Sequence, residues 1–217
     1  MRYQDRTDAG RRLASELTRR SFTRPIVLAL PRGGVPVARE VARVLEAPME
    51  IFVARKVGAP AQPEFGIGAI AEGGVRVIDH RTVALLGLTE AGLQALVEVE
   101  ERELNRRVTG YRGGRPIPDL GGRDVILVDD GLATGVTAEA ALVALKQHHP
   151  LRLILAVPVC APQTRDRLAD MADEVFCAVA PDSFAAVGLW YDDFSQVTDE
   201  QVAELVRGAS SPGHNTG

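Results

Sequence analysis

The sequence predicts an α/β fold in which an open, mostly parallel sheet is flanked by helices. Short apolar runs alternate with longer stretches in which apolar residues recur at helical spacing, the pattern of successive βαβ units. The length of 217 residues suits one domain, and 46% hydrophobic with 25% charged residues is the balance of an ordinary globular protein. Two of the apolar runs also end in glycine-containing turns that open helices, as strands of such a sheet do.

The first half of the chain is expected to hold two strand–helix units, a loop and a long helix. Its predicted helices cover residues 8–20, 35–45 and 89–108, the last with Thr89 as N-cap, and its strands cover 25–30 and 49–54. The stretch 57–74 is rich in Gly, Pro and Ala. We expect it to form a mobile loop that carries a small hairpin into 75–78.

A Gly/Pro-rich connector over 110–122 leads into the second half. Strands are predicted over 124–130, 151–160 and 174–180, and helices over 136–147, 163–171 and 198–206, the last capped by Thr198. We therefore expect a single domain over 1–207, with 208–217 as a frayed tail.

Composition argues against several classes of protein. The formal net charge of −4 argues against a nucleic-acid-binding surface. No window approaches the ~20 apolar residues of a membrane helix. The charged N-terminus is not followed by the apolar stretch of a signal peptide, so we expect a cytoplasmic protein.

Cysteines and histidines offer no obvious site. Cys160 and Cys177 are far apart in the sequence and lie in or beside apolar runs, which favours buried free thiols over a disulfide framework or a zinc site. His80, His148 and His149 have no partners at the spacing of a metal site or a catalytic triad, and we expect them on the surface.

The stretch 125–137, Val-Ile-Leu-Val-Asp-Asp-Gly-Leu-Ala-Thr-Gly-Val-Thr, carries the clearest chemical signal. A buried strand delivers Asp129 and Asp130 to the carboxyl edge of the sheet, where open α/β folds bind ligands. Two glycines then allow a tight turn, and the helix that follows presents free N–H groups to an anion. A turn whose acids merely cap the helix is the alternative. The whole pattern favours a phosphate site beside two acceptors, which suits a sugar phosphate with a vicinal diol.

Four apolar residues, two acids and a run of small residues with Thr and Gly resemble the signature of the type I phosphoribosyltransferases. The resemblance implies that Asp129 and Asp130 contact the ribose 2′- and 3′-hydroxyls. It implies that the 5′-phosphate is held by Ala133, Thr134, Gly135, Val136 and Thr137, with Gly131 as a further substrate-binding residue. Ala133 stands where many members of the family have a second Thr.

The wider chain, over roughly residues 2–206, is similar to a bacterial group of phosphoribosyltransferases of unsettled substrate. The Asp-Arg-Thr-Asp-Ala-Gly-Arg stretch near the N-terminus, the Leu-Pro-Arg-Gly-Gly turn and the Trp-Tyr-Asp-Asp-Phe loop carry this resemblance. It implies the Rossmann-like open sheet of the type I fold, with a flexible loop and a small C-terminal hood.

Pro31-Arg32-Gly33-Gly34 follows the first strand and opens a helix. Its two glycines can expose consecutive N–H groups to an anion, and Arg32 adds a fixed positive charge. The resemblance implies that this is the pyrophosphate loop, with a tight turn and an exposed Arg as the alternative.

Arg55 and Lys56 are predicted to end the second strand at the same sheet edge, where they could bind a phosphate or form a solvated charge pair. The 57–74 loop occupies the position of the family's catalytic lid, and no role is assigned to its Glu64 and Glu72.

Aromatic residues gather in the loop 184–194, which includes Trp190. They could stack on a planar base whose N–H edge is read by Asp192 or Asp193, or they could form a hydrophobic cap or a dimer contact.

The implied function is a transferase that uses 5-phosphoribosyl-1-pyrophosphate and Mg²⁺ to transfer ribose-5-phosphate to a nitrogenous base, releasing pyrophosphate. Asp129, Asp130 and Arg32 are its expected catalytic residues. They would bind and orient the substrate, and the two acids could hold Mg²⁺ at most through water. The resemblance also favours a homodimer, with no membrane partner.

Two other functions fit parts of the pattern. A non-catalytic sensor could bind the same sugar phosphate, but a regulator acting on nucleic acid should carry a basic face or an added domain. A receiver-like or hydrolytic domain could use Asp129 as nucleophile or Mg²⁺ ligand, but the later strand 151–160 ends without the Lys it needs.

Overall fold

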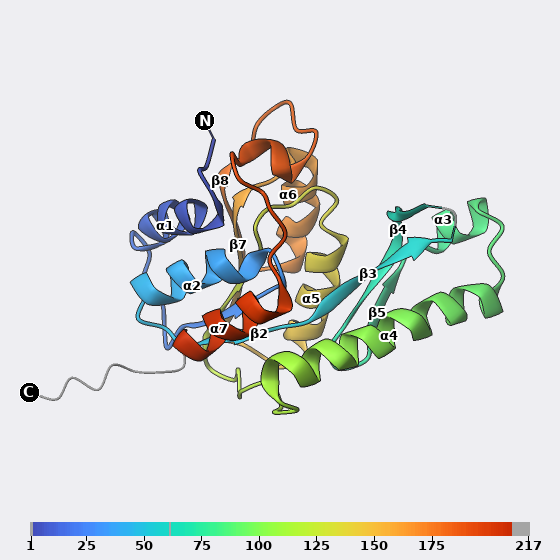
Figure 1. Cartoon of the computed structure of the whole chain (residues 1–217), viewed down its shortest axis with the longest axis horizontal. Helices are drawn as coiled ribbons and strands as arrows, with labels where there is room; N and C mark the ends of the chain where they lie inside the picture. The colour runs from blue at the N-terminus through green and yellow to red at the C-terminus, as the bar shows by residue number, and fades with distance from the viewer. Residues whose placement is uncertain (1, 61, 210–217) are drawn as a thin grey trace, which may run out of the picture.

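The computed structural model describes residues 2–60 and 62–209. Its centre is a parallel sheet with the strand order β2-β1-β6-β7-β8, which confirms the predicted α/β class. The strands are β1 (Ile26–Ala29), β2 (Met49–Ile51), β6 (Asp124–Val128), β7 (Arg152–Val159) and β8 (Glu174–Val179). Figure 1 shows α1 (Arg6–Leu17), α2 (Gly34–Val44) and α7 (Asp199–Ala209) on one side of this sheet, with α5 (Val136–Lys146) and α6 (Pro162–Leu168) on the other.

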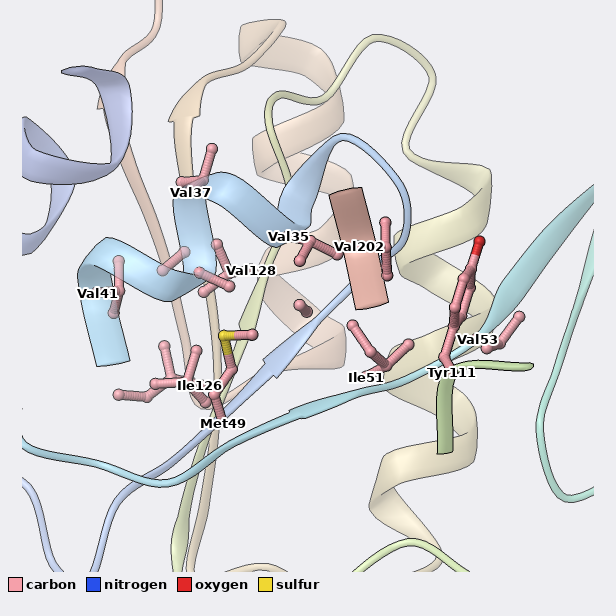
Figure 2. Close-up of a cluster of buried hydrophobic side chains, with 14 of the residues drawn as sticks. Val35, Val37, Val41, Met49, Ile51, Val53, Tyr111, Ile126, Val128 and Val202 are labelled. Atoms are coloured by element: carbon pink, nitrogen blue, oxygen red, sulfur yellow. The ribbon is translucent and has the colours of Figure 1, made fainter. Parts of the chain in front are cut away.

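Both faces of the parallel sheet are buried. On β1, Val27 and Ala29 join the cluster under α1, α2 and α7, whereas Ile26 and Leu28 join the cluster under α5. Figure 2 shows the first cluster, in which valines of α2 lie over side chains of β2 and β6. Because each strand is covered on both sides, its residues are apolar without interruption, which is why these strands are visible in the sequence.

A second, antiparallel sheet forms an arm beside the first. Its strands β3 (Ala54–Ala59), β4 (Gln62–Ala71) and β5 (Val75–Ile78) lie in that order, between α4 (Glu90–Arg112) and α5. Figure 1 shows α4 running along the arm, with the short α3 (His80–Leu85) near its tip.

The arm corrects the prediction of a mobile loop over 57–74. The chain leaves the parallel sheet after β2 and begins a new strand at Ala54, so most of this stretch is paired strand. Several of its glycines serve close packing: a Cβ at Gly58 would lie 2.2 Å from the carbonyl oxygen of Pro63, at a register shift between β3 and β4. Glycine-rich composition marks both flexible loops and close backbone contacts, and here it marks the second.

The predicted N-caps of α4 and α7 are confirmed. Thr89 Oγ1 accepts the Gly92 amide at 3.1 Å, and Thr198 Oγ1 accepts the Gln201 amide at 3.2 Å. The last helix extends to Ala209, two residues into the stretch predicted as a tail, and residues 210–217 lie outside the described part of the chain.

The predicted surface positions of three histidines are confirmed. His80, His148 and His149 are exposed, as predicted. Among the described residues, no helix has both the length and the apolar character needed to cross a membrane.

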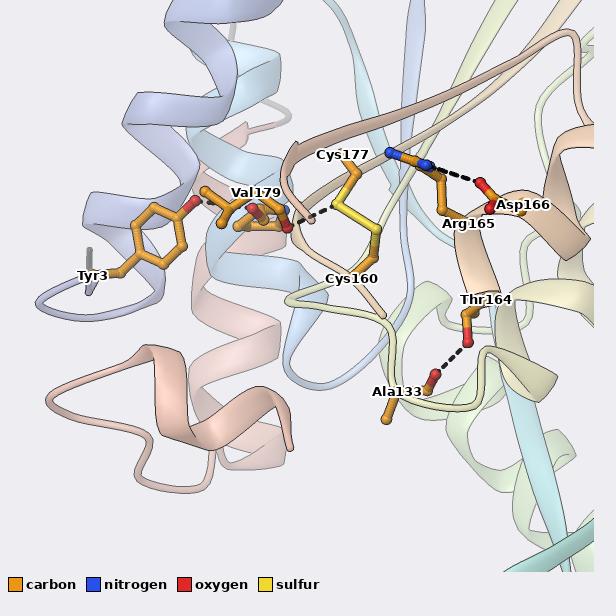
Figure 3. Close-up of a disulfide and its surroundings, with 9 residues drawn as sticks. Tyr3, Ala133, Cys160, Thr164, Arg165, Asp166, Cys177 and Val179 are labelled. Carbon is orange, nitrogen blue, oxygen red and sulfur yellow. Dashed lines mark hydrogen bonds and ion pairs between the residues drawn. A yellow bond between two sulfur atoms is a disulfide. The ribbon is translucent and has the colours of Figure 1, made fainter. Parts of the chain in front are cut away.

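The expectation of two free thiols was wrong. Cys160, directly after β7, and Cys177, on β8, form a disulfide (Figure 3). They are separated by 17 residues in the sequence, but β7 and β8 are neighbours in the parallel sheet, so the strand pairing brings the two sulfurs together. The disulfide could not be predicted from the spacing of the cysteines, because it depends on which strands are neighbours in the sheet.

Reducing this disulfide is expected to lower the stability of the fold. It closes a loop with a sequence separation of 17 residues, and a cross-link of that size stabilises by about 3 kcal/mol. Urea unfolding with and without a reductant measures the loss. The double variant Cys160→Ala with Cys177→Ala is the control, because reductant should not change its midpoint. A wild-type midpoint that ignores reductant would contradict the assignment.

Candidate functional site

Loops from two neighbouring strands meet at the carboxyl edge of the parallel sheet. From β1 the chain crosses through α2 to β2 on one side, and from β6 it crosses through α5 to β7 on the other. The sheet order therefore reverses between β1 and β6, and open α/β folds bind ligands in the crevice at such a point. Residues 31–34 follow β1 and residues 129–135 follow β6, so both predicted anion loops border this crevice.

The two loops touch each other directly. The Leu30 amide donates to the Val128 carbonyl at 2.9 Å, continuing the pairing of β1 with β6. A Cβ placed on Gly33 would lie 2.0 Å from Oδ2 of Asp130. One on Gly34 would lie 2.6 Å from the Val128 carbonyl oxygen. Glycine is required here because only a backbone without Cβ lets the first loop lie against the acids of the second.

Asp129 and Asp130 are adjacent carboxylates in an enclosed place. Burial raises the pKa of Asp129 well above its ordinary value, and the neighbouring Asp130 charge adds to the rise. Burial also raises the pKa of Asp130, and the Arg6 guanidinium opposes that rise. Oδ1 of Asp129 accepts the Asp130 amide at 2.8 Å. The pair is thus a set of acceptors that is costly to keep charged without a cation or hydroxyl donors nearby.

Arg6, the first residue of α1, supplies that cation. Its Nε donates to Oδ2 of Asp130 at 2.7 Å, and the two side chains are only 11% and 14% exposed. Its guanidinium also lies 3.9 Å from the centre of the Phe194 ring. The Tyr191 hydroxyl donates to the backbone carbonyl of Asp130 at 2.6 Å, so the N-terminal and C-terminal segments both meet at this acid.

The loop after Asp130 leaves several backbone amides at the start of α5 without an acceptor in the part of the protein that the structure describes. Gly135 has a φ of +69°, a left-handed conformation suited to glycine, and it precedes the first turn of α5. In the described part of the chain, the amides from Ala133 to Ala138 donate to no protein acceptor. Ala133 and Thr134 are also exposed. Consecutive free amides at a helix N-terminus bind anions such as phosphate.

The Pro31–Gly34 turn is less open than the sequence indicated. The Gly34 amide donates to the Leu30 carbonyl at 3.0 Å and the Val35 amide donates to the Arg32 carbonyl at 3.2 Å. Among the described residues, the amides of Arg32 and Gly33 have no recorded acceptor, so they are the donors that remain for an anion. The Arg32 guanidinium lies 3.7 Å from Asp199 at the start of α7, and the Pro31–Arg32 peptide bond is cis.

Arg55 and Lys56 lie on β3 of the arm and do not end a strand of the parallel sheet, which corrects their predicted position. Arg55 forms an ion pair with Glu100 of α4, with Nε donating at 2.6 Å. Lys56 lies across Gly66 beside Val136, near the start of α5. Of the two cations, Lys56 is therefore nearer the loop that follows β6.

Glu72, which had no assigned role, has a structural one. It accepts the Val53 amide at 2.6 Å and forms an ion pair with the buried Arg112 of α4. Arg112 Nη1 also donates to the Ile51 carbonyl at 3.0 Å. These contacts tie the arm to the end of β2.

The aromatic loop forms a cap over the acid pair. Its central part is the 3₁₀ turn η2 (Val187–Trp190), and Trp190 packs against the buried pair Tyr3 and Tyr191. Tyr191 and Phe194 contact the Arg6–Asp130 pair directly. Asp192 and Asp193 are both exposed.

The site offers few protein ligands for a metal. Within residues 2–60 and 62–209, no group of three or more His, Cys, Asp or Glu side chains is placed to hold a metal ion. Asp129 and Asp130 are two adjacent carboxylates beside the anion loops. That donor set fits Mg²⁺, which is commonly held by one or two carboxylates while substrate phosphates and water supply its other ligands.

A model of the phosphoribosyl transferase domain matches residues 2–193 of this chain. The chain belongs to the phosphoribosyltransferase family. This confirms the resemblance on which the sequence interpretation rested, and it agrees with the crevice, the acid pair and the free amides described above.

Relatives of this phosphoribosyltransferase-family chain support the assignment. A protein of Mycobacterium tuberculosis strain H37Rv, named "putative phosphoribosyl transferase", is 45% identical over 204 residues, which is 94% of this chain and 46% of the relative. The chain thus spans about half the length of the curated relatives it matches first. The crystal structure of TT1426 from Thermus thermophilus matches at 44% identity with a TM-score of 0.80, covering 97% of this chain and 100% of that one. AQ2163 from Aquifex aeolicus shares the fold, at 14% identity and a TM-score of 0.51 over 84% and 78% of the two chains.

Sequence reasoning missed several residues that shape this family member's site. Arg6 lies in the N-terminal stretch that carried the family resemblance, so a signal existed there, but nothing local pairs it with Asp130, 124 positions away. Tyr191 lies in the predicted aromatic loop, yet its hydroxyl contact could not be foreseen. Thr164 and Arg167 of α6 contact the loop after Asp130 and gave no sequence signal, because they occupy an ordinary helix.

Replacing Gly33 by Ala is expected to destabilise the protein by about 1–3 kcal/mol, the usual cost of inserting a methyl group into a packed site. The added Cβ would overlap the Asp130 carboxylate, which Arg6 holds in place. Urea unfolding gives the free energy of unfolding. Gly110→Ala is the matched control: its Cβ would meet nothing within 4 Å, and Ala stabilises a helix interior by roughly 0.5–1 kcal/mol relative to Gly. Equal stability of the two variants would contradict the close approach.

Replacing Arg6 by Ala is expected to destabilise the protein more at pH 8 than at pH 4. Burial already raises the pKa of Asp130, and removing Arg6 raises it further. A carboxyl group whose pKa is raised by folding destabilises the fold above its unfolded pKa, because there it must be neutralised or buried as an uncompensated charge. The loss should reach about 1–3 kcal/mol at pH 8.

Urea unfolding across this pH range measures the effect of Arg6→Ala. Arg19→Ala is the control, because Arg19 is 72% exposed and pairs with a surface Glu. A loss for Arg6→Ala that is constant with pH would show that the ion pair is not its cause.

Proposed function

We propose that this chain is a phosphoribosyltransferase that uses 5-phosphoribosyl-1-pyrophosphate and Mg²⁺ to transfer ribose-5-phosphate to a nitrogenous base or a related acceptor, releasing pyrophosphate. One observation carries the proposal: an acid pair and a run of free amides at a helix N-terminus lie together at the sheet's switch point. A ribose phosphate has two adjacent hydroxyls and one phosphate. The acid pair can accept hydrogen bonds from the hydroxyls, and the free amides that follow it in the chain can donate to the phosphate.

The predicted site residues divide into groups, and each group has its own task in the proposed reaction. Asp129 and Asp130 accept hydrogen bonds from the ribose hydroxyls, which requires Asp130 to exchange its contact with Arg6 for the ligand. The phosphate loop, defined as residues 131–135, and the first turn of α5 hold the 5′-phosphate through backbone amides. This seat includes Gly131, Ala133, Thr134, Gly135, Val136 and Thr137. Holding both ends of the ribose orients its anomeric carbon.

The departing pyrophosphate is assigned to the other loop. Gly33 of this loop lies beside the acid pair, and the amides of Arg32 and Gly33 donate to no protein group among the described residues. With these amides, the Arg32 side chain, now 3.7 Å from Asp199, can neutralise the growing negative charge. Gly34 permits the close approach of this loop. Lys56 adds a cation near the phosphate loop, because it lies beside Val136 at the start of α5. Arg55 lies against Glu100 of α4. When bound, Mg²⁺ would neutralise pyrophosphate charge beside Asp129 and Asp130.

The hood formed by the N-terminal and C-terminal segments is the proposed acceptor side. Tyr191 and Phe194 lie beside the Arg6–Asp130 pair, and Trp190 packs behind Tyr191. Of these rings, that of Phe194 is 38% exposed and presents flat apolar area close to the ribose acids, which suits a planar acceptor, while the buried Tyr191 supports it. A homodimer, which the resemblance implies, and the cytoplasmic location expected from the sequence complete the proposal.

Pyrophosphate release during incubation with 5-phosphoribosyl-1-pyrophosphate, Mg²⁺ and a panel of purines, pyrimidines and pyridine carboxylates tests the proposal. We expect release with at least one acceptor. The double variant Asp129→Asn with Asp130→Asn should lose the activity and weaken binding of 5-phosphoribosyl-1-pyrophosphate by more than roughly tenfold, because a neutral amide accepts from each ribose hydroxyl more weakly than a carboxylate does. Calorimetry measures the binding.

A charge-matched control changes two exposed acids, Glu98→Gln with Asp170→Asn, and should bind as the wild type does. Circular dichroism checks that both double variants keep the fold. Unchanged affinity in the Asp129/Asp130 variant would exclude the ribose assignment. Retained binding with no release across the whole panel would favour the non-catalytic sensor.

A further inference from the structure

Helix α6 supports the phosphate loop from the side opposite the crevice. Thr164 Oγ1 donates to the Ala133 carbonyl, as Figure 3 shows, and Arg167 Nη2 donates to the Thr134 carbonyl at 2.6 Å. Arg167 also forms an ion pair with Glu139 on the first turns of α5. Two successive loop carbonyls are therefore held by side chains of one helix.

Holding these carbonyls fixes the direction of the amides that follow them. A trans peptide unit is planar, with its C=O and N–H pointing to opposite sides. With the Ala133 and Thr134 carbonyls turned toward α6, the amides of Thr134 and Gly135 turn away from that helix. These two amides belong to the run that donates to no protein acceptor. The contacts with α6 thus prepare donors for an anion on the open side of the loop.

Packing reinforces the same arrangement. A Cβ on Gly135 would lie 2.5 Å from Cγ2 of Thr164 and 3.1 Å from Cδ1 of Leu168, so the loop rests directly on α6. Thr164 is 7% exposed, and Ala133 has no hydroxyl of its own to fix the turn. A buried hydroxyl whose removal leaves a carbonyl unpaired is costly to lose.

We propose that Thr164 and Arg167 are positioning residues that hold the phosphate loop in the shape that binds the 5′-phosphate. The inference rests on the proposed function, since it assigns that phosphate to this loop. Neither side chain needs to touch the ligand. Each acts through a backbone carbonyl. Replacing either side chain should therefore weaken the binding only of ligands that use this loop.

The helix provides matched variants for the test. Thr164→Val removes the hydroxyl and keeps the shape, whereas Thr164→Ser keeps the hydroxyl. Arg167→Ala removes the contact with Thr134, whereas Arg165→Ala removes an Arg of similar exposure, 42% against 43%, whose partner is Asp166 on the same helix. Because Arg167 is partly exposed, its variant should fold even if Thr164→Val does not.

Calorimetry with two probes, ribose 5-phosphate and inorganic pyrophosphate, each with Mg²⁺, separates a local effect from general damage. We expect Thr164→Val and Arg167→Ala to weaken ribose 5-phosphate binding by roughly three- to tenfold, the value of one hydrogen bond. Thr164→Ser should stay within about twofold of the wild type, because it keeps the hydroxyl donor. Arg165→Ala should do the same, because an exposed ion pair contributes little. Pyrophosphate affinity should be unchanged in all four.

Three results would overturn the inference. Wild-type affinity for ribose 5-phosphate in Arg167→Ala would show that the contact does not shape the loop. Equal weakening of both probes would indicate general damage rather than positioning. Failure of the wild type to bind ribose 5-phosphate, 5-phosphoribosyl-1-pyrophosphate and pyrophosphate would remove the proposed function and this inference together. If the wild type binds these ligands but the variants do not show the expected loss of affinity, only this inference is overturned and the proposed function stands.

Discussion

The parallel pairing of β1 with β6 is the constraint on which the rest of the site depends. It places the turn after one strand against the turn after the other, so closely that the Gly33 backbone lies against the Asp130 carboxylate. Every other feature is arranged around that contact. The helices α2 and α5 begin at these two turns, and their N-termini border one crevice because the sheet order reverses between the two strands.

Placing two adjacent carboxylates in this contact is electrostatically costly, and the protein compensates from the chain ends. Burial raises the pKa of both acids, and Arg6 of α1 lies on one of them. Tyr191 reaches the backbone of the same residue from the C-terminal loop. The resulting arrangement holds acceptors that a hydroxyl-bearing ligand can satisfy. A site that strains its own electrostatics in this way is typical of a functional centre rather than of a helix cap.

The two sides of the site are supported by different means. On the crevice side, glycines allow backbones to approach. On the far side, α6 holds the loop carbonyls, and the Cys160–Cys177 disulfide joins the strands from which α6 departs and to which it returns. In the arm, the predicted hairpin into 75–78 is confirmed as β4–β5, whereas the prediction of a mobile loop over 57–74 is wrong. A glycine-rich composition is typical of mobile segments, but Gly58 of the arm accommodates a neighbouring backbone. Composition alone does not distinguish these two uses.

The sequence by itself determined the local features: the buried strands, the helix caps at Thr89 and Thr198, and the acid–glycine–threonine run that follows β6. These are readable because burial on both faces, capping and tight turns each restrict residues that are near one another in the chain. Only the tertiary structure decided the pairing of Arg6 with Asp130, the support of the phosphate loop by Thr164 and Arg167, and the disulfide. Each joins residues that are far apart along the chain, and sheet order and helix packing, rather than any local pattern, bring them into contact.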